Sequence, residues 1–567
     1  MGKIDKIRKF WDDRNNQVKY CKWLIKYTKP YTGKLALLLF LGLFSTATTL
    51  IMAVISKELI DSATGGSKER VIRIIFIYIA FIIATQVFEV ITSLVKTMLN
   101  EKFSFGIRKQ VYDKILTSSW IQVQKYHTGD LMTRLTSDAG AIADGIINTI
   151  TDIISLTFEF IMVFFTLFIY SPWLAVFAVL IAPIGMIISV WFGRKLKTLQ
   201  IKVQESEATY RSFLQESIAN LLIVKAFANE EYASKRLVNL RDERFLWVFK
   251  KTKLGVVSSN VMAVSFQLGY ITAFTYGALQ VADGLITYGT MSIFLTLVNQ
   301  IQAPIMQLAH QIPKIVAILA SAGRVMDIQN MQTEDYTDMG IQYNRIGINV
   351  KNLEFGYTNE KVLENISFMI KEGEMVAIIG ESGIGKTTLI RLIMSFLIAE
   401  RGEILFYGQD GVPKKVNASC RKFIAYVPQG NTLFSGTIRE NIRMGCLQAS
   451  EEEILSALKL TSAYDFVREL PDGIDTIIGE RGHGLSEGQA QRIALARAIV
   501  RKAPVLILDE ATSALDEQTE LNVLKGINSL EPKPTCIVIT HRKSILKYCN
   551  RELVIVNKHI NENDHKA

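Results

Sequence analysis

The chain has 567 residues, too many for one ordinary hydrophobic core, so we expect at least two domains. Hydrophobic residues make up 49% of it and are concentrated in about the first 320 positions, which predicts a membrane part followed by a soluble part. The net charge is +10, but the basic residues accompany the apolar segments, so we expect no nucleic-acid partner. The five cysteines form no CxxC pair, which argues against a zinc site or a disulfide framework.

Residues 1–34 form a charged lead rich in lysine and aromatic residues. This composition is compatible with an amphipathic helix on the inner membrane surface and equally with a solvated tail. We expect no cleavable signal peptide, because the first apolar run begins only after this long lead.

Six apolar segments follow, at about 35–56, 71–95, 146–170, 173–193, 255–281 and 289–318. Each is long enough to cross a bilayer core of about 30 Å as a helix. They predict an all-α six-helix transmembrane domain over residues 35–325. Lysine and arginine crowd the 194–254 connection and are absent from the turn at 171–173. The N-terminus, both long connections and the C-terminal part are therefore expected in the cytoplasm, and the chain in the cell membrane as a multi-pass protein.

Polar residues inside the predicted spans are candidates for a substrate path. Glu89 and Glu159 lie in the second and third spans, and Gln300, Gln307 and Gln311 share one face of the sixth span with Pro304. A water-filled cavity would use these residues, but contacts between helices, or carboxylates that reach the membrane surface, would explain them too. The sequence leaves both interpretations open.

Residues 326–345 read as a linker, and the pattern changes at residue 346. Short apolar runs such as 375–379 and 505–508 alternate with helical stretches, which predicts an α/β domain over 346–567. Its strongest motif matches the phosphate-loop pattern GxxxxGK[ST] between a strand and a helix. The predicted nucleotide-binding residues of this loop are Gly380, Glu381, Ser382, Gly383, Ile384, Gly385, Lys386, Thr387 and Thr388.

The loop glycines allow backbone N–H groups to face phosphate oxygens, and the following helix adds positive potential. Lys386 is expected to reach the β- and γ-phosphates of ATP, and Thr387 to ligate Mg²⁺. A second apolar strand ends in Asp509 and Glu510. Asp509 is predicted to hold the Mg²⁺ shell and Glu510 to act as the general base on the attacking water. The fold class is thus a helical transmembrane domain followed by an α/β P-loop NTPase domain.

The segment 485–492, LSEGQAQR, resembles the signature of the ATP-binding cassette (ABC) family. The similarity extends over nearly the whole chain, including TGDLMTRLTSD at 128–138, and is to the exporter-type half-transporter. Glu487 stands where the family usually has glycine, at a position that often varies.

The resemblance implies further roles. Tyr357 would stack on adenine, Gln429 would contact Mg²⁺ and water, and His541 would contact the γ-phosphate as a catalytic residue beside Glu510. Ser486, Gly488 and Gln489 would bind the γ-phosphate held by a second subunit. The loop 513–516 would cross the dimer interface, and the loop 476–482 would touch the cytoplasmic helices of the membrane domain.

One phosphate loop and one signature cannot complete such a site, so a second subunit is expected. A homodimer is the simplest solution, and a heterodimer remains possible. The implied function is ATP-driven export by alternating access, with ATP and Mg²⁺ as cofactors. The protein would lie among membrane lipids, and its cargo would be an amphipathic drug-like molecule, a peptide or a lipid. Coupling helices are expected near 119–127 and 212–221.

Two alternatives remain: an importer on the same membrane fold, and a sensor or gated channel driven by the same ATP cycle. Vesicle transport assays distinguish them. The end of the chain also departs from the family, because residues 556–560 lack the usual glycine and a final helix is missing. This predicts weaker stability or dimer contacts but intact catalysis.

Overall fold

A computed structural model describes residues 17–341, 344–358, 360–408, 411–430, 432–479 and 482–564, except for the side chains of residues 178–190, 543 and 564. The chain divides into two compact units. The membrane unit comprises Met1–Tyr112 and Thr128–Gln329, and the nucleotide unit comprises Asp113–His127 and Asn330–Ala567. Residues 113–127 were expected in the membrane domain, but they pack with the second unit because the short helix they contain contacts its surface.

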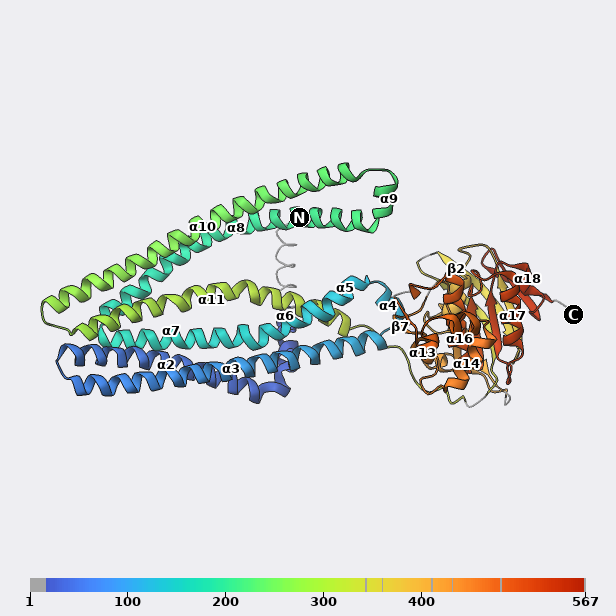
Figure 1. Ribbon diagram of the computed structural model, residues 1–567, viewed down its shortest axis with the longest axis horizontal. Coiled ribbons are helices and arrows are strands. Elements are labelled where there is room, and N and C mark those ends of the chain that lie inside the picture. The colour runs from blue at the N-terminus through green and yellow to red at the C-terminus, as the bar shows by residue number, and fades with distance from the viewer. Residues whose placement is uncertain are drawn as a thin grey trace. The chain divides into compact units, whose positions relative to one another are not determined.

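The membrane unit is entirely helical among its described residues (Figure 1). Its elements are a helical segment at 17–28, η1 (Lys29–Tyr31), α2 (Thr32–Thr64), α3 (Lys68–Thr117), α5 (Thr128–Thr133), η2 (Arg134–Asp138), α6 (Ala139–Asp144), η3 (Gly145–Thr149), α7 (Ile150–Tyr170), α8 (Pro172–Ala219), α9 (Leu221–Ala226), α10 (Glu230–Ala282) and α11 (Tyr288–Gln329). The elements η2 and η3 are π-helical. Extended Ser171, followed by Pro172 in the first turn of α8, ends one helix and begins the next.

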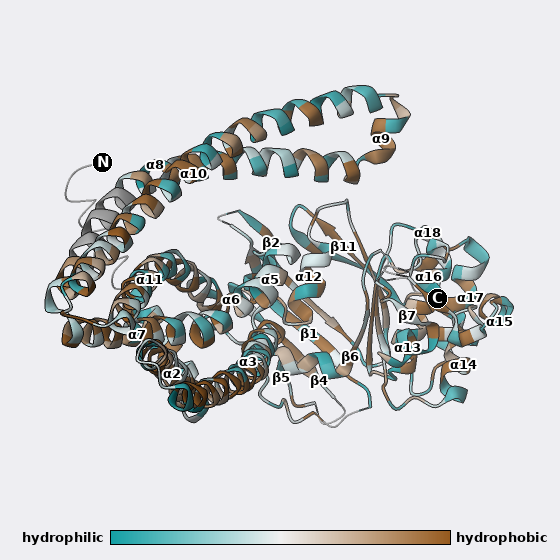
Figure 2. Ribbon diagram, turned by 60° about the vertical axis from the view of Figure 1, so that its left-hand side comes forward, coloured by the Kyte–Doolittle hydropathy of each residue, from teal (hydrophilic) through white to brown (hydrophobic). Residues whose placement is uncertain are grey.

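Five helical stretches among the described residues are long and apolar enough to cross a membrane. They are Gln17–Thr64, Lys68–Thr117, Thr128–Tyr170, Glu230–Ala282 and Tyr288–Gln329. The remaining expected span, 173–193, lies in α8, but most of its side chains are outside the described residues. Figure 2 shows the strongly apolar character of α2 and α3. Ile72, Phe76, Ile83 and Leu94 of α3 are exposed, as expected for a helix that faces lipid or a second subunit.

Helices α2, α7 and α11 pack together around an apolar core that includes Leu50, Leu167, Phe294 and Leu297. Helices α8 and α10 run alongside each other as a hairpin whose tip is α9 (Figure 1). A coupling helix was expected near 212–221; in the structure α8 continues to Ala219, and a separate short helix, α9, spans Leu221–Ala226. Residues up to 219 continue α8, and the chain turns at Asn220, whose side-chain amide donates to the Glu216 carbonyl (3.0 Å).

The segment 17–28 is a helix whose aromatic side chains contact the membrane unit. The Trp23 indole N–H donates to Gln329 Oε1 (2.8 Å), and Gln329 Nε2 donates to the Tyr27 hydroxyl (3.1 Å). The Tyr20 ring lies so close to Gly323 that an added Cβ there would be 3.1 Å from it. The described part of the lead therefore packs against the end of α11; residues 1–16 lie outside the described residues.

An ion pair between the buried Asp138 carboxylate and the exposed Arg324 guanidinium joins η2 to α11. Asp138 accepts hydrogen bonds from Arg324 Nε (2.8 Å) and from the Ser321 hydroxyl (2.9 Å). Arg134 donates to the Arg324 carbonyl (2.6 Å). Polar contacts thus fix the start of the third span against the sixth.

The nucleotide unit is an α/β structure. Its strands are β1 (Gly347–Gly356), β2 (Lys361–Ile370), β3 (Met375–Ile379), β4 (Arg401–Tyr407), β5 (Lys414–Lys415), β6 (Ile424–Val427), β7 (Gly436–Thr437), β8 (Ile477–Ile478), β9 (Val505–Asp509), β10 (Thr535–Ile539), β11 (Arg551–Val556) and β12 (His559–Asp564). Its helices are α4 (Trp120–Gln124), α12 (Lys386–Ile393), η4 (Ala418–Phe423), α13 (Ile438–Arg443), α14 (Glu451–Leu460), α15 (Tyr464–Glu469), η5 (Gly473–Asp475), α16 (Glu487–Val500), α17 (Glu517–Asn528) and α18 (Lys543–Leu546).

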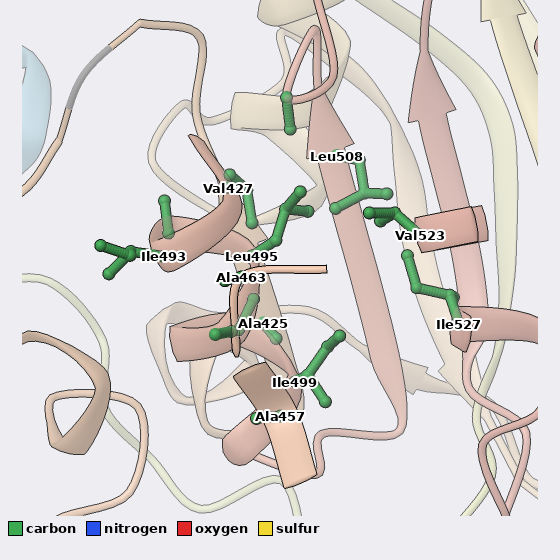
Figure 3. Close-up of a cluster of buried hydrophobic side chains, with 14 of the residues drawn as sticks. Ala425, Val427, Ala457, Ala463, Ile493, Leu495, Ile499, Leu508, Val523 and Ile527 are labelled. Carbon is green, nitrogen blue, oxygen red and sulfur yellow. The ribbon is translucent and has the colours of Figure 1, made fainter. Parts of the chain in front are cut away.

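The central sheet has the order β12-β11-β3-β10-β9-β6 and is parallel except for β12. Strands β3, β9 and β10 are apolar and almost entirely buried, as expected when helices cover both faces. On one face, residues of α16 and α17 pack against β6 and β9, including Ile499, Val523, Val427 and Leu508 (Figure 3). Because parallel strands end at one edge, the loops after β3, β6, β9 and β10 meet there.

A second, antiparallel sheet has the order β2-β1-β4-β5. The final hairpin β11–β12 turns through Asn557 and Lys558, which adopt positive φ of 49° and 69°. Asparagine tolerates this conformation, so the hairpin forms although the usual glycine is missing. Lys558 and His559 also contact Glu364 of β2.

Candidate nucleotide site

The phosphate loop connects β3 to α12 at the edge where the parallel strands end. Gly383 and Gly385 adopt positive φ of 82° and 112°, which residues with a Cβ rarely do. A Cβ at Gly385 would also lie 3.0 Å from Val362. The glycines therefore let the loop curl in front of the free N–H groups that begin α12, an arrangement suited to binding phosphate.

Lys386 is buried at the start of α12 and folds back over the loop. Its Nζ donates to the carbonyls of Gly380 (2.7 Å) and Glu381 (3.1 Å) and lies 3.1 Å from His541 Nε2. Burial lowers the pKa of Lys386, and the carboxylates of Glu510 and Asp509 oppose this effect. A buried ammonium held by carbonyl and imidazole groups is well matched to an anionic ligand.

Two hydroxyl groups converge on Asp509 at the end of β9. Thr387 Oγ1 donates to Asp509 Oδ2 (3.3 Å), and the Tyr426 hydroxyl donates to the same oxygen (3.2 Å). Burial raises the pKa of Asp509, although these hydrogen bonds lower it. A carboxylate beside a threonine hydroxyl is the oxygen donor set that Mg²⁺ prefers. Among the described residues no cluster of three or more His, Cys, Asp or Glu side chains could hold a metal ion.

Glu510 follows Asp509 and lies between two side chains predicted to act with it. Gln429 Nε2 donates to Glu510 Oε2 (2.7 Å), and His541 Nε2 lies 3.2 Å from Glu510 Oε1. One ring nitrogen cannot donate to Glu510 and accept from Lys386 at the same time, so the two contacts of His541 compete. The backbone of Glu510 has a positive φ of 51°, a strained conformation that holds its carboxylate toward the loop.

A cavity of about 230 Å³ joins these groups. It is lined by Ser382, Gly383, Gly385, Lys386, Thr387, Thr388, Gln429 and Glu510. At its side, the hydroxyl of half-exposed Tyr357 lies 3.4 Å from Thr388 Oγ1, and the ring packs edge-on against Phe355. The sequence-predicted residues that line this cavity come from three separate segments: the phosphate loop, Gln429 and Glu510.

The signature residues are not part of this cavity. Ser486 caps α16 and exchanges hydrogen bonds with Gln489: the Gln489 N–H donates to Ser486 Oγ (3.2 Å), and the Ser486 N–H donates to Gln489 Oε1 (2.9 Å). A Cβ at Gly488 would be 2.9 Å from the Ala514 carbonyl, so glycine permits this approach. None of these three residues is among those that line the cavity.

Sequence reasoning missed two residues that hold the loop 513–516. The buried amide of Gln491 donates to Ser513 Oγ (3.2 Å) and accepts from the Ala514 N–H (3.0 Å). Arg542 donates to the carbonyls of Ser513 (2.7 Å) and Leu515 (2.8 Å). Tyr426 was missed as well, although its place three residues before Gln429 puts it near the strand end. In the loop 476–482, residues 480 and 481 lie outside the described residues.

The candidate residues of the membrane unit are less closely gathered. Glu89 and Gln307 are exposed, and Glu159 is half-buried. Gln300 Oε1 and Gln311 Oε1 are buried atoms without a hydrogen-bond partner among the described residues. The neighbouring Gln302, which the sequence pattern did not select, likewise has an unpartnered Nε2. Pro304 and Pro313 lie inside the same helix, α11.

These features define an ATP-binding P-loop unit attached to a multi-pass helical membrane unit. Residues 35–305 match the family model described as the ABC transporter transmembrane region, and residues 363–513 match the model described as ABC transporter. The chain belongs to the ABC transporter family and is of the exporter type, an ATPase coupled to transport across the cell membrane.

Its relatives agree with this assignment. The ATP-dependent lipid A-core flippase of Syntrophus aciditrophicus is 31% identical over 562 residues, covering 98% of this chain and 93% of the relative. A putative multidrug export ATP-binding/permease protein of Staphylococcus aureus is 29% identical, covering 95% and 96% of the two chains. The structure of a bacterial Atm1-family ABC exporter with ATP bound has the same fold, with a TM-score of 0.78, 24% identity and 95% coverage of both chains.

Proposed function

We propose that two copies of this chain form a homodimer that hydrolyses Mg²⁺-ATP at two shared sites and exports a lipid-like amphipathic substrate. The arrangement of the site carries this proposal: the loop, Glu510 and Gln429 line one cavity with His541 beside Glu510, while Ser486, Gly488 and Gln489 do not line it. A second copy would supply the missing signature, and a two-fold axis would complete both sites alike.

Within each site, Thr387, Asp509 and Gln429 would hold Mg²⁺, which when bound neutralises phosphate charge. Lys386 binds the terminal phosphates, and Tyr357 offers its ring face to adenine. The other loop residues, from Gly380 to Thr388, contribute backbone N–H groups and a loop shape that fits the phosphates.

Glu510 accepts the proton of the attacking water at a carboxylate oxygen, as a general base. Gln429, already bonded to that carboxylate, orients it, and His541 donates from Nε2 toward the γ-phosphate position instead of toward Glu510. The strained backbone of Glu510 fits this role, because such a conformation persists only where the surrounding structure holds the residue in one orientation.

The exposed tip of the α8–α10 hairpin supports the dimer. Leu222, Ile223 and Phe227 at this tip are largely exposed, an arrangement that water disfavours. The nucleotide unit offers a groove of about 570 Å³ beside β6 that includes Tyr426 and Phe434. We infer that the α9 tip of one copy docks into this groove on the other copy and acts as the second coupling helix.

The proposed cargo rests on the relatives and on α11. Relatives at 31% and 33% identity are named lipid A-core flippases, which suggests a cargo with a polar head and apolar chains. The unpartnered amides of Gln300, Gln302 and Gln311 would bind polar groups of such a cargo, with apolar helices beside them. A drug-like amphipath satisfies the same chemistry, as a relative named a putative multidrug exporter indicates, and a peptide is a further alternative.

The test is reconstitution of the full chain in proteoliposomes with a fluorescent phospholipid and, separately, a cationic dye as probes. We expect a mass of two copies in lipid nanodiscs, ATP-dependent movement of the phospholipid, and loss of movement in Gln302→Leu. Movement of the dye alone would replace the lipid proposal with a drug-like cargo. A single copy that hydrolyses ATP at the full rate would overturn the shared site.

A further inference from the structure

The linker that follows α11 pairs directly with the chain that enters α4. The Ser119 N–H donates to the Gln332 carbonyl (2.9 Å), and the Glu334 N–H donates to the Thr117 carbonyl (2.9 Å). These residues all belong to the nucleotide unit. Both strands of this short pairing are continuous in sequence with membrane helices, α3 on one side and α11 on the other. Two of the three covalent connections between the units, those through α3 and through α11, therefore meet at one place on the nucleotide unit.

Glu334 fastens this meeting point to the nucleotide unit through Arg421. The guanidinium donates to both carboxylate oxygens, at 2.5 and 3.0 Å, and only 9% of the Glu334 side chain and 23% of the Arg421 side chain are exposed. Arg421 also donates to the carbonyls of Met394 (3.0 Å) and Ser395 (2.8 Å). The Trp120 N–H at the start of α4 donates to Glu334 Oε1 (3.4 Å). A bidentate, largely buried pair has far less freedom than a surface ion pair.

An aromatic contact also joins α4 to the rest of the nucleotide unit. The Arg421 guanidinium lies 4.0 Å from the centre of the Phe396 ring, and the Trp120 ring packs against Phe396 at 5.6 Å. Phe396 thus lies between the arginine and the coupling helix. Displacement of α4 requires that this stack and the ion pair move together.

Arg421 is also joined to the nucleotide site by a short, direct path. It lies in η4, which is followed at once by β6, and β6 ends just before Gln429. Gln429 donates to Glu510 at the cavity (2.7 Å). A change at the nucleotide site that moves Gln429 therefore acts on a strand whose other end is held by the Arg421 contacts.

We propose that Glu334 and Arg421 are positioning residues that couple ATP hydrolysis to the membrane helices. Their ion pair holds α4 and the linker on the nucleotide unit, so that movement at the end of β6 is passed to α3 and α11. This inference rests on ATP-driven transport and is independent of the cargo and of the homodimer. If the pair only stabilised the unit, its loss would lower thermal stability and leave the response of the membrane helices to nucleotide unchanged.

The experiment uses the full-length protein in lipid nanodiscs and the variants Glu334→Gln, Arg421→Gln and the double variant. Glu364→Gln is the matched control, because its ion pair with Lys558 lies in the same unit but is exposed (37% and 46%). Two quantities are measured: ATP hydrolysis, and hydrogen exchange of the extracellular turn 282–287 with and without ATP and vanadate. The second readout needs no cargo.

We expect each single variant to hydrolyse ATP at a rate within about twofold of wild type. The difference in hydrogen exchange of the turn 282–287 between the states with and without ATP and vanadate should be about tenfold smaller than in wild type, a size typical of coupling between sites. The double variant should lose no more than either single variant, because both changes remove one interaction. A normal exchange response in Glu334→Gln would overturn the proposal, as would strictly additive losses.

Trp120→Ala provides a second route if the ion-pair variants fold poorly. Trp120 is partly exposed, and its replacement removes the ring contact with Phe396 without leaving a buried charge. We expect the same loss of response with hydrolysis retained, and an unchanged response in this variant would contradict the inference. Movement of the fluorescent phospholipid is measured in parallel. Wild-type protein that shows the exchange response but moves no phospholipid would refute the lipid cargo alone.

Discussion

Glu510→Gln tests the central chemical assignment, because it preserves the size of the side chain while removing its charge and basicity. In the structure, Glu510 uses both oxygens: Gln429 donates to one at 2.7 Å, and His541 lies 3.2 Å from the other. Glutamine has a single acceptor, so one of the two contacts is lost. The loss of this hydrogen bond costs roughly 1–3 kcal/mol of interaction free energy.

The effect on turnover should be larger. A positioned general base contributes about 10²–10⁴ in rate, which corresponds to roughly 3–5 kcal/mol in the activation barrier. We therefore expect phosphate release to fall by at least about a hundredfold. ATP affinity should be retained, because Lys386, Thr387 and Tyr357 are unchanged.

The assay is phosphate release at saturating ATP, with binding of a fluorescent ATP analogue measured in parallel. Glu517→Gln is the control: it removes the same charge from an exposed position at the start of α17. Hydrolysis within about tenfold of wild type, clearly less than the loss expected of a general base, would refute the role of Glu510.

Three further outcomes are expected. Tyr357→Ala should weaken ATP binding by about 1–3 kcal/mol, the usual contribution of stacking between a base and an aromatic ring, whereas Tyr357→Phe should bind nearly normally in equilibrium titrations. Asp138→Asn should lower the melting temperature, because it leaves Arg324 without its charged partner. Asp509→Asn should raise the melting temperature of the nucleotide-free protein at pH 7 and abolish Mg²⁺-dependent hydrolysis.

The pH dependence of stability checks the last prediction. The folded-state pKa of Asp509 is raised, so its ionisation reduces the stability of the folded protein as pH rises above the unfolded pKa of 3.8. An Asp509→Asn protein no more stable than wild type at pH 7 would contradict the burial argument.

The nucleotide site was largely predictable because its motifs dictate local geometry. A loop such as 380–387 needs glycine at positions of positive φ and lysine at the start of a helix, so the spacing itself encodes the structure. Tyr426, Gln491 and the contacts of Arg542 could not be found in this way. They act through partners many residues away, and only the order of strands in the sheet brings them together.

In the membrane unit, the sequence predicted the long helices but not where they end or how they pack. Hydropathy indicated helices long and apolar enough to cross a membrane, because burial in lipid demands long apolar helices, and five such stretches are found among the described residues. It could not locate the end of α8, where polar residues up to 219 still favour a helix and only Asn220 breaks it. Nor could it show which glutamines are covered, since that depends on packing between helices. Gln302 is buried with an unpartnered amide, although it lies off the polar face selected from sequence.

The attachment of the linker to α4 bears on how the protein can be cut into pieces. A fragment that begins at β1, residue 347, would leave Glu334 behind and expose the Phe396 ring to water. Arg421 would then have no carboxylate partner from the linker. A fragment that begins at residue 330 keeps the linker but still lacks the helix that covers this ring. The nucleotide unit is therefore assembled from two separate stretches of the chain, and a soluble version that retains its native surface requires both of them.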